Sequence, residues 1–205
     1  MKGLSLPILI DVGRTELQWR FFERYAAAEA QEEVLAAVAS EELDTSAVTA
    51  SQDCVAFGYA GWAYWLLYLR GFLEYQERGV LERDNVYARY FVDQYLPGPH
   101  DPGLRKELSD ESSALARVSA RFADFRGLID HPQATTAAAA LAPVRLLASC
   151  RRKDDLHDVH DAATGAVVKV RAVDGWHRLF AARLGGVPQL AGVVRLDEAT
   201  WTRVT

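Results

Sequence analysis

One segment near the C-terminus constrains the fold of this 205-residue chain more than any other. Apolar residues alternate from Ala166 to Val173, which predicts a strand, and Asp174-Gly175 then predicts a turn. A short helical pattern follows at once and ends at Gly185-Gly186. A strand that turns directly into a helix presents backbone N–H groups at the helix start, and these favour an anion. The segment therefore predicts a phosphate-binding strand–turn–helix.

Two basic residues, His177 and Arg178, lie in the first turn of that predicted helix. Cations at this end oppose the helix dipole, so their presence is unfavourable unless an anion binds there. Both side chains can hydrogen-bond a phosphate. The alternative is that the carboxylate of Asp174 caps the helix and that both basic side chains are merely solvated. We favour the anion site.

The same residues resemble the ParB/sulfiredoxin superfamily, whose members carry Gly-x-His-Arg or Gly-x-Arg-Arg at a strand-to-helix turn. The resemblance covers roughly residues 141–198, the C-terminal third of the chain. Leu141-Ala-Pro-Val-Arg-Leu-Leu is similar to the preceding core strand, and Gln189-Leu-Ala-Gly-Val-Val-Arg-Leu is similar to the closing strand. Members include CTP-binding partition proteins, ATP-dependent sulfinic-acid reductases and kinases of free serine, and this chain looks closest to the last group.

The resemblance implies that the turn holds the phosphates of a nucleotide. The expected cofactors are ATP or ADP, with CTP as an open alternative, together with Mg²⁺. The residues expected to contact the nucleotide are Gly175, Trp176, His177, Arg178 and Arg183.

Two departures narrow the activities that the resemblance implies. Trp176 stands where sulfiredoxins carry their reactive cysteine, and without a thiolate the reduction of a sulfinic acid is excluded. In partition proteins a helix-turn-helix region follows the motif, whereas this chain ends 27 residues after Arg178. The net charge of −5 also argues against a nucleic-acid partner, because phosphate neutralisation needs surplus Lys and Arg. We expect no binding to nucleic acid.

The remaining composition is that of an ordinary globular protein. Half of the residues are hydrophobic and a quarter are charged. Cys54 and Cys150 lie far apart and match no metal-binding spacing, so a reduced, cytoplasmic protein is the simplest expectation. The longest uncharged run, Cys54 to Leu69, contains two glycines and is too short for a membrane span, so we expect no membrane partner.

The chain divides into a helical part and a smaller part that contains strands, which predicts an α+β fold. Residues 1–13 are expected to form a strand, residues 14–132 a mostly helical block, and residues 133–205 the ParB/sulfiredoxin-like α/β module. Helices are predicted over about 15–39, 52–78, 82–96 and 104–128, and a hairpin turn over 161–165. If the N-terminal strand joins the C-terminal sheet, the helical block is an insertion; otherwise it is a separate domain.

Carboxylates for catalysis and for a metal ion are harder to place. Asp174, His177 and Asp11 are the candidate catalytic residues, Asp11 because it ends a predicted strand that could border the same cleft. Asp154 and Asp155 are candidates for Mg²⁺, which needs few protein ligands. A transition-metal site in the Asp154–Asp161 stretch is disfavoured, because residues three apart point to opposite faces of a strand.

These observations predict a nucleotide-dependent phosphotransferase that acts on a small hydroxylated metabolite, with serine as the first guess from the resemblance. The alternative is a non-catalytic ligand-binding or interaction module that serves a biosynthetic pathway. A ParB-like nucleotide switch or DNA-binding protein is the least favoured reading. The expected partner is a small-molecule substrate, and a homodimer remains an open alternative.

Overall fold

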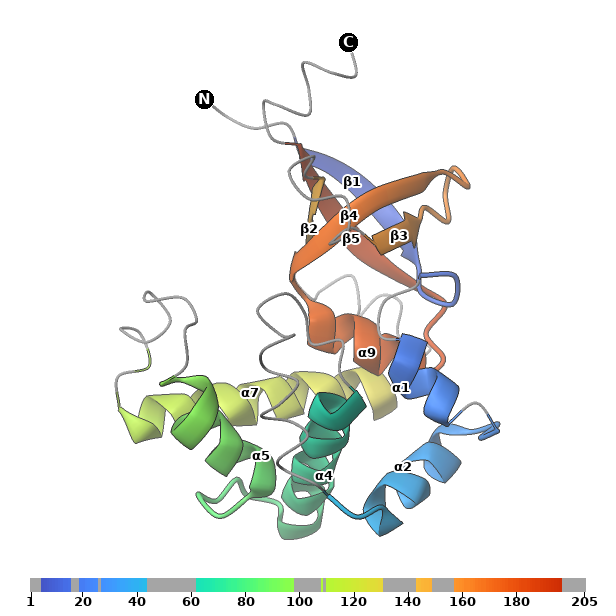
Figure 1. Ribbon diagram of the computed structural model, residues 1–205. Helices are drawn as coiled ribbons and strands as arrows, with labels where there is room; N and C mark the ends of the chain where they lie inside the picture. The colour runs from blue at the N-terminus through green and yellow to red at the C-terminus, as the bar shows by residue number, and fades with distance from the viewer. Residues whose placement is uncertain are drawn as a thin grey trace. The chain divides into compact units, whose positions relative to one another are not determined.

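The computed structural model describes residues 5–15, 19–25, 27–43, 62–97, 108, 110–130, 143–148 and 157–196. Within these ranges the chain combines α-helices and β-strands (Figure 1). No described helix has both the length and the apolar character that a membrane span requires. The backbone alone is described for ten residues of the helices and strands, namely Trp19, Arg20, Glu23, Trp62, His157, Arg171, Ala172, Val173, Asp174 and Leu196.

The chain forms two compact units. One unit consists of two distant segments, Met1–Leu17 and Phe125–Thr205, and the other is the continuous segment Gln18–Asp124. We call them the sheet unit and the helical unit. The first strand of the chain belongs to the sheet unit, so the helical unit is inserted between two parts of that unit in sequence.

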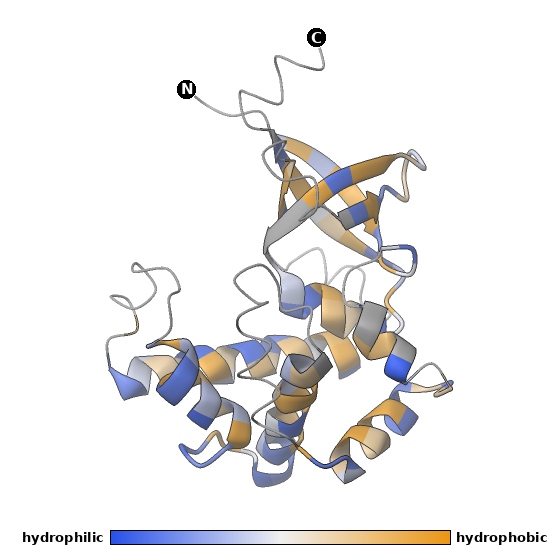
Figure 2. Cartoon of the chain, in the orientation of Figure 1, coloured by the Kyte–Doolittle hydropathy of each residue, from blue (hydrophilic) through white to orange (hydrophobic). Residues whose placement is uncertain are grey.

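The sheet unit is built on five described strands in the order β1-β5-β2-β4-β3. The strand β5 pairs antiparallel with β1 and parallel with β2, and β4 pairs antiparallel with β2 and β3. Hydrophobic residues run along β1 and β5 (Figure 2), and Ile10, Val144 and Val194 are buried. The bounds are β1 Ser5–Asp11, β2 Val144–Ala148, β3 His157–His160, β4 Val167–Asp174 and β5 Gln189–Leu196.

The two edge strands of the sheet are joined through Asp161. An antiparallel bridge pairs Asp161 with Ile10, and the Ala162 N–H donates to the Leu9 carbonyl over 2.7 Å. The Asp161 carboxylate accepts hydrogen bonds from the Leu9 N–H at 3.1 Å and from the Thr164 hydroxyl at 2.5 Å. The same residue thus shapes the turn between β3 and β4 and ties that turn to β1.

The sheet unit contains one whole helix, α9, which follows β4, and the C-terminal end of another, α7, which precedes β2. The helix α9, Trp176–Leu184, buries Phe180, whose ring stacks on that of Phe125 with centroids 6.1 Å apart. Phe125 lies in α7, Glu111–Asp130, whose last residues belong to this unit. The α9 helix ends as predicted, at Gly185-Gly186, where Gly186 has a φ of 68°.

The helical unit departs from the predicted element boundaries. The single helix predicted over 15–39 is wrong, because α1, Trp19–Arg24, and α2, Gln31–Ser40, are separate helices. The break lets Arg24 and the Tyr25 hydroxyl hydrogen-bond the carboxylate of Glu41, at the C-cap of α2. These tertiary hydrogen bonds join the two helices and accompany the break. The hydroxyl of Thr15, just before α1, donates to the Asp11 carbonyl over 2.6 Å.

The helices predicted over 82–96 and 104–128 also begin later than predicted. The third begins at Val86, because the side chain of Asn85 caps it by accepting from the N–H groups of Tyr87 and Ala88, both at 3.1 Å. The fourth begins at Glu111, after Asp110, which accepts from the Ser113 N–H at 2.8 Å. The bounds are α4 Trp62–Arg78, α5 Val86–Tyr90, the π-helical turn η1 Phe91–Tyr95, and α7 as above.

The aromatic residues of α4 form the core of the helical unit. Four of them are less than 2% exposed, namely Tyr64, Trp65, Tyr68 and Phe72. The hydroxyls of Tyr64 and Tyr87 lie 2.8 Å apart in this core. The aromatic residues of α4 thus pack the interior of the helical unit.

The carboxylate of Asp161 makes the stability of the sheet unit depend on pH. The Thr164 hydroxyl, followed by the N–H groups of Leu9 and Ala163, lowers the pKa of Asp161 below its ordinary value. Because the native pKa is lowered, the carboxylate stabilises the fold at pH values above its unfolded-state pKa of about 3.9. This stabilisation is lost as the pH falls through the native pKa. We predict that Asp161→Asn is less stable than wild type at pH 7 and that the difference shrinks below about pH 4.

Denaturant unfolding at a series of pH values, followed by circular dichroism, measures this difference. Thr164→Ala removes the largest single contribution and should give an intermediate loss at pH 7. An Asp161→Asn protein with the wild-type stability at pH 7 would show that the carboxylate does not hold the edge strands together.

Candidate functional site

The predicted turn between strand and helix is present, and glycine forms its centre. The strand β4 ends at Asp174, and Gly175 follows with φ 101° and ψ 10°, a left-handed conformation that favours glycine. The Gly175 carbonyl accepts the first hydrogen bond of α9, from the Leu179 N–H at 3.0 Å. Gly175 is therefore the N-cap residue, and the alternative that Asp174 caps this helix is wrong. As the N-cap residue, Gly175 has no side chain with which to cap the helix.

Neighbouring groups lie so close to Gly175 that they leave no room for a side chain. A Cβ atom at this position would lie 3.1 Å from Nη2 of Arg178 and 3.1 Å from both Cα and Cγ1 of Val144. The guanidinium of Arg178 therefore lies against the backbone of the turn. Val144, the first residue of β2, packs against the other side of Gly175.

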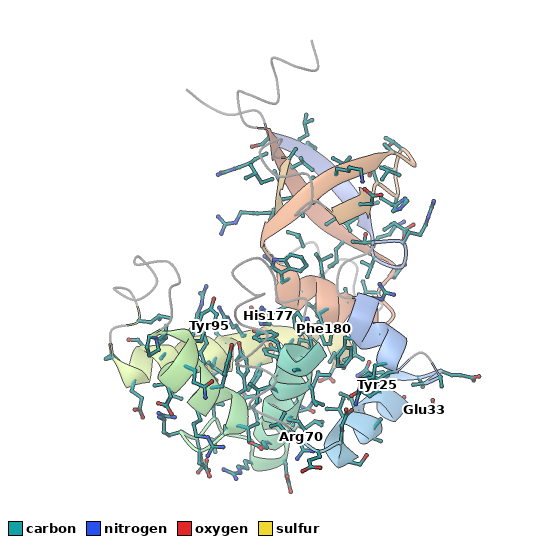
Figure 3. The ribbon with its side chains drawn as sticks, viewed as in Figure 1. Tyr25, Glu33, Arg70, Tyr95, His177 and Phe180 are labelled. Carbon is teal, nitrogen blue, oxygen red and sulfur yellow. The ribbon has the colours of Figure 1, made fainter. Side chains whose placement is uncertain are left out.

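The first turn of α9 concentrates positive charge. His177 and Arg178 are both half-buried, and His177 lies one turn before the buried Phe180 (Figure 3). All residues of this turn are described, and none of them is acidic. The N–H groups at the helix start and the dipole add to the same positive field. Chemically, the turn suits a phosphate or another compact anion.

Two other residues predicted to hold the nucleotide lie elsewhere on α9. The Trp176 side chain is 7% exposed and packs in the core, so its backbone N–H is its main group available to a ligand. The Arg183 guanidinium donates to the Thr15 carbonyl over 3.1 Å, and burial lowers the pKa of Arg183. Arg183 thus holds the loop that follows β1 and is not gathered with Arg178 at the turn.

Asp11 lies at the end of β1, paired with Gln189. Its carboxylate accepts from the Arg14 N–H at 3.2 Å. The strands β5 and β2 separate β1 from β4, and the loop after Asp11 is bonded to Arg183 in the last turn of α9. The described contacts of Asp11 are thus with Gln189, Arg14 and Thr15.

The predicted magnesium ligands Asp154 and Asp155 lie outside the described residues. Farther along the same stretch, Asp158 Oδ1 is 2.7 Å from Nζ of Lys169 on the paired strand, and Asp161 shapes the turn. Among the described side chains, no group of three His, Cys, Asp or Glu residues gathers as a metal site would require.

One basic residue near the turn was missed by the sequence reasoning. Arg145 on β2 pairs with Asp174 on β4, directly before Gly175. Its position in the sequence, about thirty residues earlier, carries no signal of this proximity, because only strand register brings the two together. The alternation of buried and exposed residues in Val144–Ala148 does mark Arg145 as an exposed strand position.

Searches against protein-family models, curated proteins and solved structures found no match to this chain. The residues of the turn therefore carry the functional inference by themselves.

The crowding at Gly175 predicts a loss of stability on substitution. Gly175→Ala should destabilise the protein by about 2–3 kcal/mol, because the left-handed backbone and the contacts with Val144 and Arg178 both oppose a methyl group. Gly186→Ala is the matched control: its φ is 68°, but nothing lies within 4 Å of the added atom. It should cost about 1 kcal/mol. If Gly175→Ala and Gly186→Ala lose the same amount of stability in urea denaturation, Val144 and Arg178 can move aside without a further cost in free energy.

Proposed function

We propose that the Gly175–Arg178 turn binds the phosphates of a nucleotide and that the protein transfers a phosphoryl group to a small hydroxylated metabolite. The observation that carries this proposal is the guanidinium of Arg178 lying against Gly175 at an uncapped helix start. The backbone N–H groups at the start of a helix and an arginine beside them are the donors that a phosphate binds. A bound phosphate would accept hydrogen bonds from the N–H groups of the turn and from Arg178.

The order of elements around the turn supports the same proposal. A core strand β2, the strand β4, the turn, α9 and the strand β5 follow in the order expected of a ParB/sulfiredoxin-like module. Within this resemblance, the kinases of free serine are the members that a chain with Trp176 in place of the reactive cysteine fits best. The proposed nucleotides are ATP or ADP, with CTP as a further option.

The reaction assigns distinct tasks to the residues of the turn. The N–H groups at the start of α9, with His177 and Arg178, orient the phosphates and stabilise the charge that develops on them. A carboxylate must accept the proton of the attacking hydroxyl, and Asp174, directly before the turn, is the proposed base. When bound with the nucleotide, Mg²⁺ offsets phosphate charge, and it needs few protein ligands.

Nucleotide binding should depend on Arg178. We predict that wild-type protein binds ATP or ADP in the presence of Mg²⁺ and that Arg178→Ala lowers the affinity by about tenfold to a hundredfold. A charge-assisted hydrogen bond to phosphate contributes about 1.5–3 kcal/mol, which accounts for this range. Isothermal titration calorimetry measures both affinities.

Arg195→Ala is the matched control for this experiment. Arg195 is an exposed arginine of the same sheet, on β5, and its replacement removes the same charge away from the turn. It should bind nucleotide with nearly wild-type affinity. If the wild type gives no heat of binding with ATP, ADP or CTP, the nucleotide site is refuted. If Arg178→Ala and Arg195→Ala lose the same affinity, the contribution of Arg178 is only a general effect of charge.

Phosphoryl transfer is tested separately from binding. Wild-type protein incubated with nucleotide, Mg²⁺ and a panel of hydroxylated metabolites, serine included, should yield a phosphorylated product detectable by mass spectrometry. Asp174→Asn should bind nucleotide but lose most of the turnover, because an amide cannot accept the proton. Binding without turnover of any compound would instead assign a non-catalytic nucleotide-binding module.

A further inference from the structure

Val144 packs directly against the Gly175 turn from a neighbouring strand. A Cβ atom on Gly175 would lie 3.1 Å from both Cα and Cγ1 of Val144, and 3.1 Å from Nη2 of Arg178. The backbone and the branched side chain of Val144 are therefore both in close contact with the turn. Val144 is 1% exposed and belongs to β2, which is paired with another strand on each side. The turn thus rests on a buried residue whose own backbone is held by the sheet.

The surroundings of Val144 restrict its side chain as well. Because valine carries two methyl groups on Cβ, its χ1 angle is confined to few rotamers. The partner of Val144 on β5 is Gly192, and the space over that glycine is filled from β1. A Cβ atom on Gly192 would lie 2.8 Å from Cδ1 of Ile10 and 2.9 Å from Cγ2 of Ile8. The side chain of Val144 cannot move into this space, because Ile8 and Ile10 occupy it.

We infer that Val144 is a positioning residue of the phosphate site, because its side chain holds Gly175 in the conformation that places the donors of the turn. The inference rests on the proposed function. Gly175 has a φ of 101°, but glycine adopts other conformations at little cost, so the residue does not fix the turn by itself. Hydrogen bonds to phosphate need N–H donors within about 2.7–2.9 Å of the oxygens, so a small displacement of the turn weakens them.

The first hydrogen bond of α9 reports whether Val144 holds the turn. The Leu179 N–H donates to the Gly175 carbonyl over 3.0 Å, and at the other end of the helix the Gly185 N–H donates to the Ala181 carbonyl over 2.8 Å. In Val144→Ala, hydrogen exchange at Leu179 should accelerate about tenfold more than at Gly185, because the cavity frees the turn before the far end of the helix. Nuclear magnetic resonance measures both exchange rates.

The same variant should bind nucleotide more weakly. We expect the affinity of Val144→Ala for ATP with Mg²⁺ to be about threefold to tenfold below that of the wild type, because binding must then order a looser turn. Isothermal titration calorimetry measures both affinities.

Two variants separate positioning from general stability. Val194→Ala truncates another buried valine of the sheet unit, opposite Leu146, and should accelerate exchange at Leu179 and Gly185 by the same factor. Val144→Thr keeps the branched shape but buries a hydroxyl, so it should lose overall stability and still keep the wild-type ratio of the two rates. Both variants should bind ATP within about twofold of the wild-type affinity. A variant that is unfolded by circular dichroism is compared with the wild type in concentrated sucrose, which favours the folded state.

The remaining outcomes contradict the inference in different ways. Equal acceleration at Leu179 and Gly185 in Val144→Ala would make Val144 an ordinary core residue. A selective acceleration at Leu179 in Val194→Ala would overturn the inference too, because that valine would then share the role. Wild-type affinity for ATP in Val144→Ala would overturn it and leave the proposed function intact. If the wild type binds no ATP, the proposed function fails and the inference fails with it.

Discussion

The hydrogen bonds of Asp161 are the constraint on which the sheet unit depends. The strands β1 and β3 are the edges of the sheet in the order of pairing, and each leaves backbone groups that need partners. Asp161 supplies those partners to β1 through its bridge with Ile10 and its contact with the Leu9 N–H. The strand β1 is thereby held on both sides, by β5 and by the turn after β3. This arrangement fixes a segment of the chain that is far in sequence from the rest of the sheet.

The candidate site follows from a second backbone constraint, at Gly175. A left-handed residue between β4 and α9 turns the chain sharply, and the absence of a side chain admits both Val144 and the Arg178 guanidinium. With Gly175 as the N-cap residue, the cap position itself carries no side chain. The dipole and the basic residues of the first turn both favour an anion at this end of the helix. A protein that only needed to begin a helix would be better served by an N-cap side chain.

The helical unit is organised around its own close contact, between α4 and α5. A Cβ atom on Gly71 would lie 2.4 Å from Cβ of Tyr87, so only glycine allows the two helices to approach this closely. Asn85 secures the contact by donating to the Gly71 carbonyl over 2.7 Å while it caps α5. The guanidinium of Arg70 donates to the Val38 carbonyl at 3.2 Å, near the end of α2. These interactions are structural, and they explain why the aromatic residues of α4 are core residues.

The sequence by itself determined the features that local backbone chemistry controls. The turn at Gly175, the hairpin turn that ends at Gly165 and the helix end at Gly79 were all predicted, because each has a positive φ that glycine readily adopts. Tertiary structure decided what depends on pairing between distant segments. Strand register placed Arg145 opposite Asp174 and Asp11 opposite Gln189, and side-chain hydrogen bonds to Glu41 accompany the break in the helix predicted over residues 15–39. Hydrophobic strands can pair in many registers, so their order and partners emerge only when the whole sheet is packed.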